Sequence, residues 1–240
     1  MQRFFSYKIN FLSGAVVLVA MVWNIYNIFT NTPMVPDQHW AQKIFYIHVP
    51  VAWTGFLSYF IVMVAGILYL INKEQKWDRL GLAAAEIGTL FVTLVLITGP
   101  IWAKPIWGTW WTWEPRLTTT LILFLIYVGY FMLRSFGGHP ERTSRYAAVL
   151  GIIAFIDVPI IFYSVRFWEV QFQSHPQVEI TQQNSDIFIP FLISLIILTM
   201  LFSFMLRFRM HVLKIINPRK TYCSKLSIYL KVFNLSCKDR

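Results

Sequence analysis

The sequence predicts an all-α integral membrane protein whose six transmembrane helices pack as one bundle. Of the 240 residues, 57% are hydrophobic and only 13% are charged, and the mean hydropathy is +0.55. These values are typical of membrane proteins. The apolar residues also gather in long runs, and about 20 apolar residues are enough for one helix to cross a bilayer. Composition and segment length therefore favour the same fold class.

Six segments are long and apolar enough to cross a membrane. They are residues 11–29, 50–71, 82–102, 118–136, 147–167 and 187–208. The first follows Arg3 and Lys8, but it is longer than a signal-peptide core and no A-x-A-like cleavage motif follows it. We therefore interpret it as a membrane anchor. We expect residues 1–208 to form one membrane domain and residues 209–240 to form a basic tail.

Lys and Arg residues are distributed unevenly between the two sides of the predicted bundle. The side that holds both termini carries 17 of the 21. The four on the other side are Lys43, Lys104, Arg116 and Arg166. Because short cytoplasmic segments are enriched in Lys and Arg, we expect a multi-pass membrane protein with both termini in the cytoplasm. Three outer loops, residues 30–47, 104–118 and 166–186, then face the opposite side of the membrane.

Topology accounts for most of the net charge of +10, so we do not expect nucleic acid as a partner. Two interpretations of the basic tail stay open. Its cations, together with an apolar stripe, fit a helix that lies on anionic membrane lipid. The stripe consists of Leu226, Tyr229, Val232 and Phe233. The alternative is a solvated basic end without a partner.

Residues 104–118, KPIWGTWWTWEPRLT, are the chemically most distinctive part of the chain. Four indoles lie within seven residues, at Trp107, Trp110, Trp111 and Trp113. Lys104, Glu114 and Arg116 frame this broad, flat aromatic surface. A large planar ligand with an anionic edge fits it, which describes haem: indoles stack on the porphyrin, and Lys104 or Arg116 pairs with the propionates. The competing interpretation is an interfacial aromatic belt, although a belt distributes its aromatics over all helix ends.

Histidines of the outer face are candidate iron ligands. His48 comes just before the second predicted span, at the depth of the Trp-rich loop, and His175 lies in the third outer loop. Imidazole is a common axial ligand of haem, so we predict that these two hold the iron of haem b from both faces. A lone loop histidine more often makes ordinary hydrogen bonds. His39 is also on this face and is the rival for the second position.

Two acids fall within predicted spans. Glu86 lies about one turn into the third span, and Asp157 lies in the middle of the fifth, two residues before Pro159. Ionisable groups in hydrocarbon are costly and are functional candidates for that reason. The alternative is a hydrogen bond between helices, for Asp157 to a carbonyl that Pro159 leaves without a donor. We favour this alternative for Glu86 and leave both interpretations open for Asp157.

Residues 107–118, WGTWWTWEPRLT, resemble the Trp-rich signature W-G-x-x-W-x-W-D-x-R-L-T of haem-handling membrane proteins. Residues 46–50, YIHVP, and 159–168, PIIFYSVRFW, are similar to the segments that accompany this signature. With six spans, the chain resembles the cytochrome c maturation protein C family over residues 46–177. Two departures stand out. Glu114 replaces the family's Asp, and Phe172 stands where the second family His is usual, so matching His175 requires a three-residue insertion.

The resemblance implies a haem-delivery protein of the system I pathway of cytochrome c biogenesis. Such a protein holds haem at the outer face of the inner membrane and passes it to a periplasmic haem chaperone. The implied membrane partners are ABC transporter subunits, both ATPase and permease, and a small single-span subunit. His48 and His175 would match the two axial ligands of the family. No bond-making chemistry is implied, so we do not expect an enzyme.

The sequence also contains no C-x-x-C, C-x-x-C-H or G-x-x-x-x-G-K-[ST] motif. Thiol–disulfide exchange, covalent c-type haem and ATP hydrolysis by this chain are therefore excluded. Three other functions remain as alternatives. The channel-synthase core of the system II assembly pathway shares the Trp signature but usually has more spans. A haem-b electron-transfer or quinone-reactive subunit places its histidines inside facing spans. In a solute transporter, the Trp-rich loop would be a belt alone.

Overall fold

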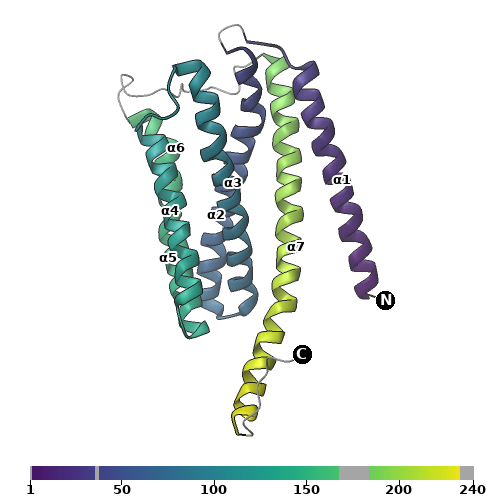
Figure 1. Ribbon diagram of the computed structural model, residues 1–240, viewed down its shortest axis with the longest axis vertical. Coiled ribbons are helices and arrows are strands. Elements are labelled where there is room, and N and C mark those ends of the chain that lie inside the picture. The colour runs from purple at the N-terminus through teal and green to yellow at the C-terminus, as the bar shows by residue number, and fades with distance from the viewer. Residues whose placement is uncertain (1, 36–37, 168–183, 233–240) are drawn as a thin grey trace.

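The computed structural model is all-helical in the part of the chain that it describes, residues 2–35, 38–167 and 184–232, and Figure 1 shows one bundle. The helices are α1 (Gln2–Asn31), the 3-10 helix η1 (His39–Ile44), α2 (Phe45–Asn72), α3 (Gln75–Trp107), α4 (Pro115–Phe136), α5 (Pro140–Ala154), α6 (Asp157–Phe167) and α7 (Ser185–Val232). Side chains are described for residues 12–35, 38–164 and 184–216. Six helical segments are long and apolar enough to cross a membrane, which confirms the predicted fold class.

The helices are longer than the predicted spans because helical structure continues past the apolar core of each segment. α3 begins at Gln75, so Glu86 lies about three turns from its start rather than one. α7 is a single helix of 48 residues that passes through residue 208, the expected end of the membrane domain. Figure 1 shows its last turns projecting beyond the other helices. The basic tail therefore begins as an extension of the last span.

The fifth span is broken into α5 and α6, and Pro159 explains the break. A proline ring clashes with the carbonyl four residues earlier, here that of Phe155, and it has no N–H to donate. The backbone accordingly tightens, with Ile156 N–H donating to the Ile153 carbonyl and Val158 N–H to that of Phe155, at 3.0 and 3.1 Å. Asp157 then begins α6, and its Oδ2 is buried without a hydrogen-bond partner in the described part of the chain. Of the two interpretations left open for Asp157, the hydrogen bond to a carbonyl is therefore not made by this oxygen among the described residues.

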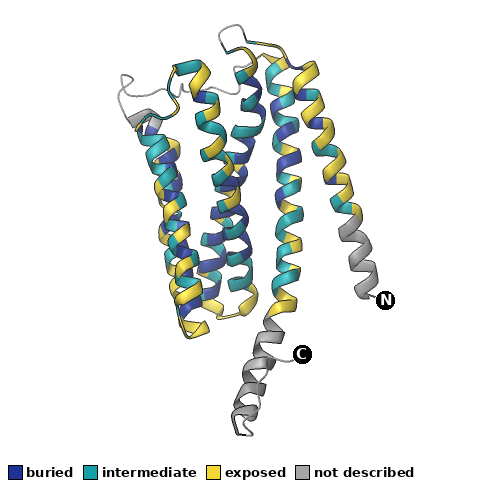
Figure 2. Cartoon of the chain, in the orientation of Figure 1, coloured by how far each residue is buried: buried dark blue, intermediate teal, exposed yellow. Residues whose placement is uncertain are grey.

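The antiparallel pair α2 and α3 is the centre of the bundle, and Figure 2 shows buried residues along both helices. Small residues let the two helices approach closely, as is common between transmembrane helices. A Cβ added to Gly88 would lie 2.8 Å from the Tyr59 ring and 3.0 Å from Ser58. Ser58 in turn donates to the Ala84 carbonyl across the helix pair, at 2.6 Å. α1 packs on α7 and leaves its outer face exposed, as a lipid-facing helix does.

An ion pair joins α3 to α7 within the span. The guanidinium of Arg209 donates two hydrogen bonds to the Glu86 carboxylate, at 2.5 and 2.6 Å. The interhelical hydrogen bond expected of Glu86 is therefore present, and its fork geometry is the strongest form of this contact. The Arg209–Glu86 ion pair thus fixes the register of α7 on α3. Arg209 was expected in the tail, yet it packs on the membrane domain.

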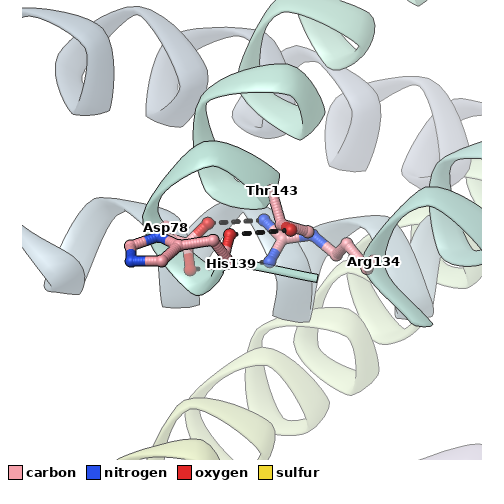
Figure 3. A network of polar contacts seen from close by, with 4 residues as sticks. All are labelled: Asp78, Arg134, His139 and Thr143. Carbon is pink, nitrogen blue, oxygen red and sulfur yellow. Dashed lines mark hydrogen bonds and ion pairs between the residues drawn. The ribbon is translucent and has the colours of Figure 1, made fainter. Parts of the chain in front are cut away.

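A second ion pair ties α3 to α4 at the end of the bundle opposite the Trp-rich loop (Figure 3). Arg134 Nη2 donates to Asp78 Oδ1 at 2.6 Å, and the two side chains are only 15% and 11% exposed. The guanidinium carbon also lies 5.0 Å from the centre of the Tyr130 ring. In the same view, Thr143 Oγ1 donates to the His139 carbonyl at 3.0 Å and closes the first turn of α5.

We expect Asp78→Asn to destabilise the bundle by about 3–5 kcal/mol, because it leaves the buried Arg134 charge uncompensated. The matched control is Glu141→Gln, which breaks the exposed pair of Glu141 with Arg145, whose side chains are 55% and 51% exposed. Exposed pairs one turn apart contribute only about 0.3–0.5 kcal/mol. Unfolding by SDS titration in detergent micelles measures both variants. Equal losses in the two variants would show that burial of the Asp78 pair carries no extra stability.

The start of α1 and the last turns of α7 lie toward the same end of the bundle, away from the Trp-rich loop (Figure 1). This arrangement follows from an even number of spans. The ends of α1, α3 and α6 and the starts of α2, α4 and α7 meet at the other end. Among the described residues, the predicted ligand His48 and the predicted rim charges Lys104, Glu114 and Arg116 belong to that end.

Candidate functional site

His48 lies inside α2, three residues after its first residue, Phe45. The sequence placed it just before the second span, but the 3-10 helix η1 leads directly into α2, so the helical structure begins earlier. The ring is half-buried and packs on α3 near Thr98 and Trp102. Thr98 is nine residues before Trp107, about 13 Å along the helix axis. His48 therefore lies deeper than the Trp-rich loop rather than level with it.

Three residues on one side of α3 hold the His48 ring. Its Nδ1 is 2.8 Å from Oγ1 of Thr98, which belongs to the neighbouring helix α3. The Trp102 ring meets it edge to face, with centroids 5.6 Å apart and planes at 65°. Gly99 faces the ring directly, and a Cβ there would lie 3.3 Å from Cε1 of His48. The imidazole is therefore held by the hydrogen bond to Thr98, the edge-to-face contact with Trp102 and the close backbone of Gly99.

An aromatic cluster supports Trp102 from behind. Phe45 lies 6.2 Å from Trp102 and 5.4 Å from Phe191, measured between ring centroids. This cluster joins the start of α2, the end of α3 and the start of α7. The indole Nε1 of Trp102 is buried and has no hydrogen-bond partner in the described part of the chain. A buried donor without an acceptor is uncommon in native structures and is a candidate contact for a ligand.

The Trp-rich loop begins where α3 ends. Gly108 adopts φ +75°, a left-handed conformation that favours glycine, and its N–H donates to the Lys104 carbonyl at 3.0 Å. Lys104 Nζ donates back to the Gly108 carbonyl at 2.8 Å. The predicted propionate partner Lys104 thus also stabilises the turn that opens the loop.

The four indoles do not form the single flat surface that the sequence suggested. Trp110 and Trp113 are 57% and 76% exposed, whereas Trp107 and Trp111 are half-buried. Trp111 and Trp113 meet edge to face, with centroids 5.8 Å apart and planes at 77°. The Trp111 Nε1 is buried and unpartnered among the described residues. The loop therefore offers two exposed rings above an inner pair that packs on the bundle.

Glu114 and Arg116 lie at the start of α4. Glu114 is buried and occupies the N-cap position, where its carbonyl accepts the Thr118 N–H at 3.0 Å. Pro115 follows as the first helical residue, where its missing N–H costs no hydrogen bond. Glu114 also interacts electrostatically with the half-buried Arg116. A buried acid and a cation therefore lie close together at the start of α4, beside the loop.

Another cation at this end, Lys43, has a structural role. It is buried, and its Nζ donates to the carbonyl and the hydroxyl of Thr32, at 2.6 and 2.5 Å. These bonds join the end of α1 to η1. Lys43 and Lys104 both donate to backbone carbonyls, whereas Arg116 makes no such bond among the described residues. Arg116 is therefore the best candidate to meet a ligand's anionic edge.

The second iron ligand is not decided by the described residues. His175 lies among residues 168–183, outside the described part of the chain. His39 is exposed at the start of η1, with φ +46°. His139 and His211 are exposed toward the opposite end of the bundle. Both candidate partners of His48 therefore stay predictions.

Sequence reasoning missed Thr98, Gly99 and Trp102 as neighbours of His48. They are about 50 residues away in the chain and come together only because α2 and α3 are antiparallel. Trp102 was recognised only as the end of a span. A small residue beside a threonine, with an aromatic four positions later, is too common in membrane helices to be a signal by itself.

Taken together, the residues fit a planar, anionic ligand that carries a metal. A fixed imidazole, two exposed indoles, a cation next to a buried acid and two buried indole donors lie at one end of a six-span bundle. Fold and site therefore define a polytopic membrane protein of the haem-handling class. The model of the family described as heme exporter protein C matches residues 2–224. The chain belongs to this family.

Individual relatives agree with the family match. The chain is 38% identical over 177 residues to heme exporter protein C of Bradyrhizobium diazoefficiens, covering 72% of this chain and 67% of the relative. It is 34% identical over 213 residues to the protein of the same name from Haemophilus influenzae, covering 85% and 83%. A putative cytochrome c biosynthesis ccmC-like mitochondrial protein of Marchantia polymorpha is 36% identical over 163 residues, covering 68% of each chain.

Proposed function

We propose that this chain binds haem b between His48 and the Trp-rich loop and delivers it to a periplasmic haem chaperone during cytochrome c maturation by system I. One observation carries the proposal: the His48 imidazole is fixed in direction by Thr98, Gly99 and Trp102 beneath the loop. Relatives named heme exporter protein C support the haem cargo. The role is transport and delivery rather than catalysis.

Each part of the site has one task in this proposal. His48 binds the iron, and the exposed rings of Trp110 and Trp113 cover the porphyrin. Arg116, held by Glu114, pairs with a propionate, with Lys104 as a second cation at the rim. The two haem propionates are anionic, so such pairing is worth more where the loop excludes water.

The second ligand sets how easily haem leaves. We propose His175, with His39 as the alternative. A delivery protein must release its cargo, and two equally tight axial bonds would retain it. In the sequence, His175 lies between α6 and α7, so it belongs to neither of the helices whose residues hold His48, α2 and α3. Unequal ligation, with His48 the stronger, suits transfer to a chaperone.

Partners follow from the same proposal. ABC transporter subunits would supply ATP hydrolysis, which this chain's motifs do not provide. A small single-span subunit is the remaining membrane partner. The system II channel synthase is less well supported, because the family match and the six spans agree with heme exporter protein C. The haem-b electron-transfer alternative keeps one observation in its favour, namely that His48 lies inside a helix.

Orientation is part of the proposal, since the site must face the periplasm. In the inner membrane of intact bacterial spheroplasts, the tail residues Cys223 and Cys237 should resist a membrane-impermeant maleimide and react after lysis. Thr109→Cys, in a variant with both native cysteines changed to serine, should react in intact spheroplasts. Labelling of Cys223 or Cys237 from outside would reverse the orientation and contradict periplasmic delivery.

The visible absorption spectrum of the detergent-purified chain tests the function directly. We expect haem to copurify, with a Soret band, and to move to an apo haem chaperone when the two are mixed. A supporting control is the variant Trp110→Ala with Trp113→Ala, which should copurify less haem. Protein that binds no haem when expressed with its ABC partners would contradict the proposal.

A further inference from the structure

We propose that Thr98 is a positioning residue: its hydroxyl fixes the tautomer of His48, so that Nδ1 carries the proton and Nε2 presents its lone pair to the iron. The proposal rests on the proposed function for the identity of the metal. The tautomer and orientation of the His48 ring are properties of the protein without haem, so they can be tested in its absence.

The assignment follows from counting hydrogens. Thr98 Oγ1 lies 2.7 Å from the Leu94 carbonyl, which can only accept, so the single hydroxyl hydrogen points there. The same oxygen lies 2.8 Å from His48 Nδ1. With its hydrogen already committed, the hydroxyl must accept at this contact, and Nδ1 must be the donor. A neutral imidazole with a proton on Nδ1 has its lone pair on Nε2.

The remaining contacts fix where that lone pair points. Gly99 leaves room for the ring, because any larger residue would place a Cβ 3.3 Å from Cε1 of His48. Trp102, one turn above Thr98, meets the ring edge to face. Thr98 itself is held by its back-bond within α3, so the acceptor does not move independently of the helix. Rotation of the imidazole would break the Nδ1 bond and collide with α3.

This arrangement does for haem iron what outer-shell partners do for metal sites in general. A hydrogen bond from the second nitrogen of a ligating histidine selects its tautomer, holds its plane and raises its basicity. Loss of such a partner typically costs about 10- to 100-fold in metal affinity. Thr98 therefore sets the strength of the His48–iron bond without touching the haem.

The first experiment examines the protein without haem. NMR of the chain labelled with [15N]histidine reports which ring nitrogen carries the proton, and His48→Gln identifies the His48 signals. We expect the Nδ1–H form in the wild type and in Thr98→Ser, which keeps the hydroxyl. Thr98→Val should lose this preference. The matched control is Thr93→Val, on the same helix, where the hydroxyl lost donates to the Thr89 carbonyl at 2.7 Å and, among the described residues, contacts no histidine.

The second experiment titrates haem into the wild type, Thr98→Ser, Thr98→Val and Thr93→Val. Thr98→Val should bind haem about 10- to 100-fold more weakly and show a changed spectrum, while Thr98→Ser and Thr93→Val stay close to the wild type. A wild-type His48 protonated on Nε2, or an unchanged tautomer and affinity in Thr98→Val, would overturn the positioning role. If no protein binds haem, the proposed function fails, and the NMR result still decides the role of Thr98.

Discussion

Removing both exposed indoles of the Trp-rich loop, with Trp110→Ala and Trp113→Ala, should weaken haem binding by about 1–3 kcal/mol, or about 5- to 150-fold. The estimate takes about 0.5–1.5 kcal/mol for each aromatic contact beyond the area buried. The bundle should remain intact, because these rings are 57% and 76% exposed and support no helix. Haem content per protein, from the absorption spectrum after purification, measures the effect.

The structure offers a control that separates a haem surface from an aromatic belt. Trp40 is also exposed at this end of the bundle, at 61%, and stacks on Phe29 outside the Trp-rich loop. Trp40→Ala should leave haem content unchanged. Phe at positions 110 and 113 should retain more haem than Ala, because a smaller aromatic ring still stacks. Unchanged haem in the double alanine variant, or an equal loss in Trp40→Ala, would return the loop to the belt interpretation.

The number and type of the helices could be predicted because the bilayer imposes a length and an apolar composition on every span. Their ends could not, because helical structure continues into the interface where composition no longer indicates it. α3 begins seven residues before the predicted span, and α2 begins five residues before it, which places His48 inside a helix. The break before Asp157 could have been predicted from Pro159, since the clash of a proline ring with the carbonyl four residues earlier is local chemistry.

The site was predictable only where its residues are neighbours in the chain. Residues 104–118 carry the indoles and rim charges within one short stretch of the chain, so the pattern is visible in the sequence. Thr98 reaches His48 through the packing of α2 on α3, and Arg209 reaches Glu86 through the register of α7. Neither register can be read from periodicity, because an apolar stripe does not specify which polar residue of another helix it will meet.

Contacts between residues far apart in the chain also explain why the structure separates cations that the sequence could not tell apart. From the sequence, Lys104 and Arg116 were equivalent candidates for the propionates, and Lys43 was only a further cation of the outer face. In the structure, Lys43 joins α1 to η1, Lys104 closes the turn at Gly108, and Arg116 lies beside the buried acid Glu114. A cation with a structural bond is less available to a ligand, because moving it leaves a carbonyl without its donor. If haem binds here as proposed, we therefore expect propionate pairing to depend more on Arg116 than on Lys104.

Replacing His48, the proposed iron ligand, should have the largest effect of any single change. His48→Gly removes the axial nitrogen, so the loss of haem affinity should be at least as large as the roughly 10- to 100-fold that loss of an outer-shell partner costs. The remaining haem should lose its six-coordinate low-spin spectrum. The ring leaves a cavity beside Thr98, Gly99 and Trp102, and added imidazole should enter it and restore the spectrum.

The same rescue identifies the second ligand. His175→Gly and His39→Gly are compared in otherwise identical protein, each with and without imidazole. We expect His175→Gly to change the spectrum and to recover with imidazole, and His39→Gly to behave as the wild type. A shift in His39→Gly alone would make His39 the partner of His48. An unchanged low-spin spectrum in His48→Gly would remove His48 from the iron, and with it the proposal that α2 and α3 form the fixed side of the site.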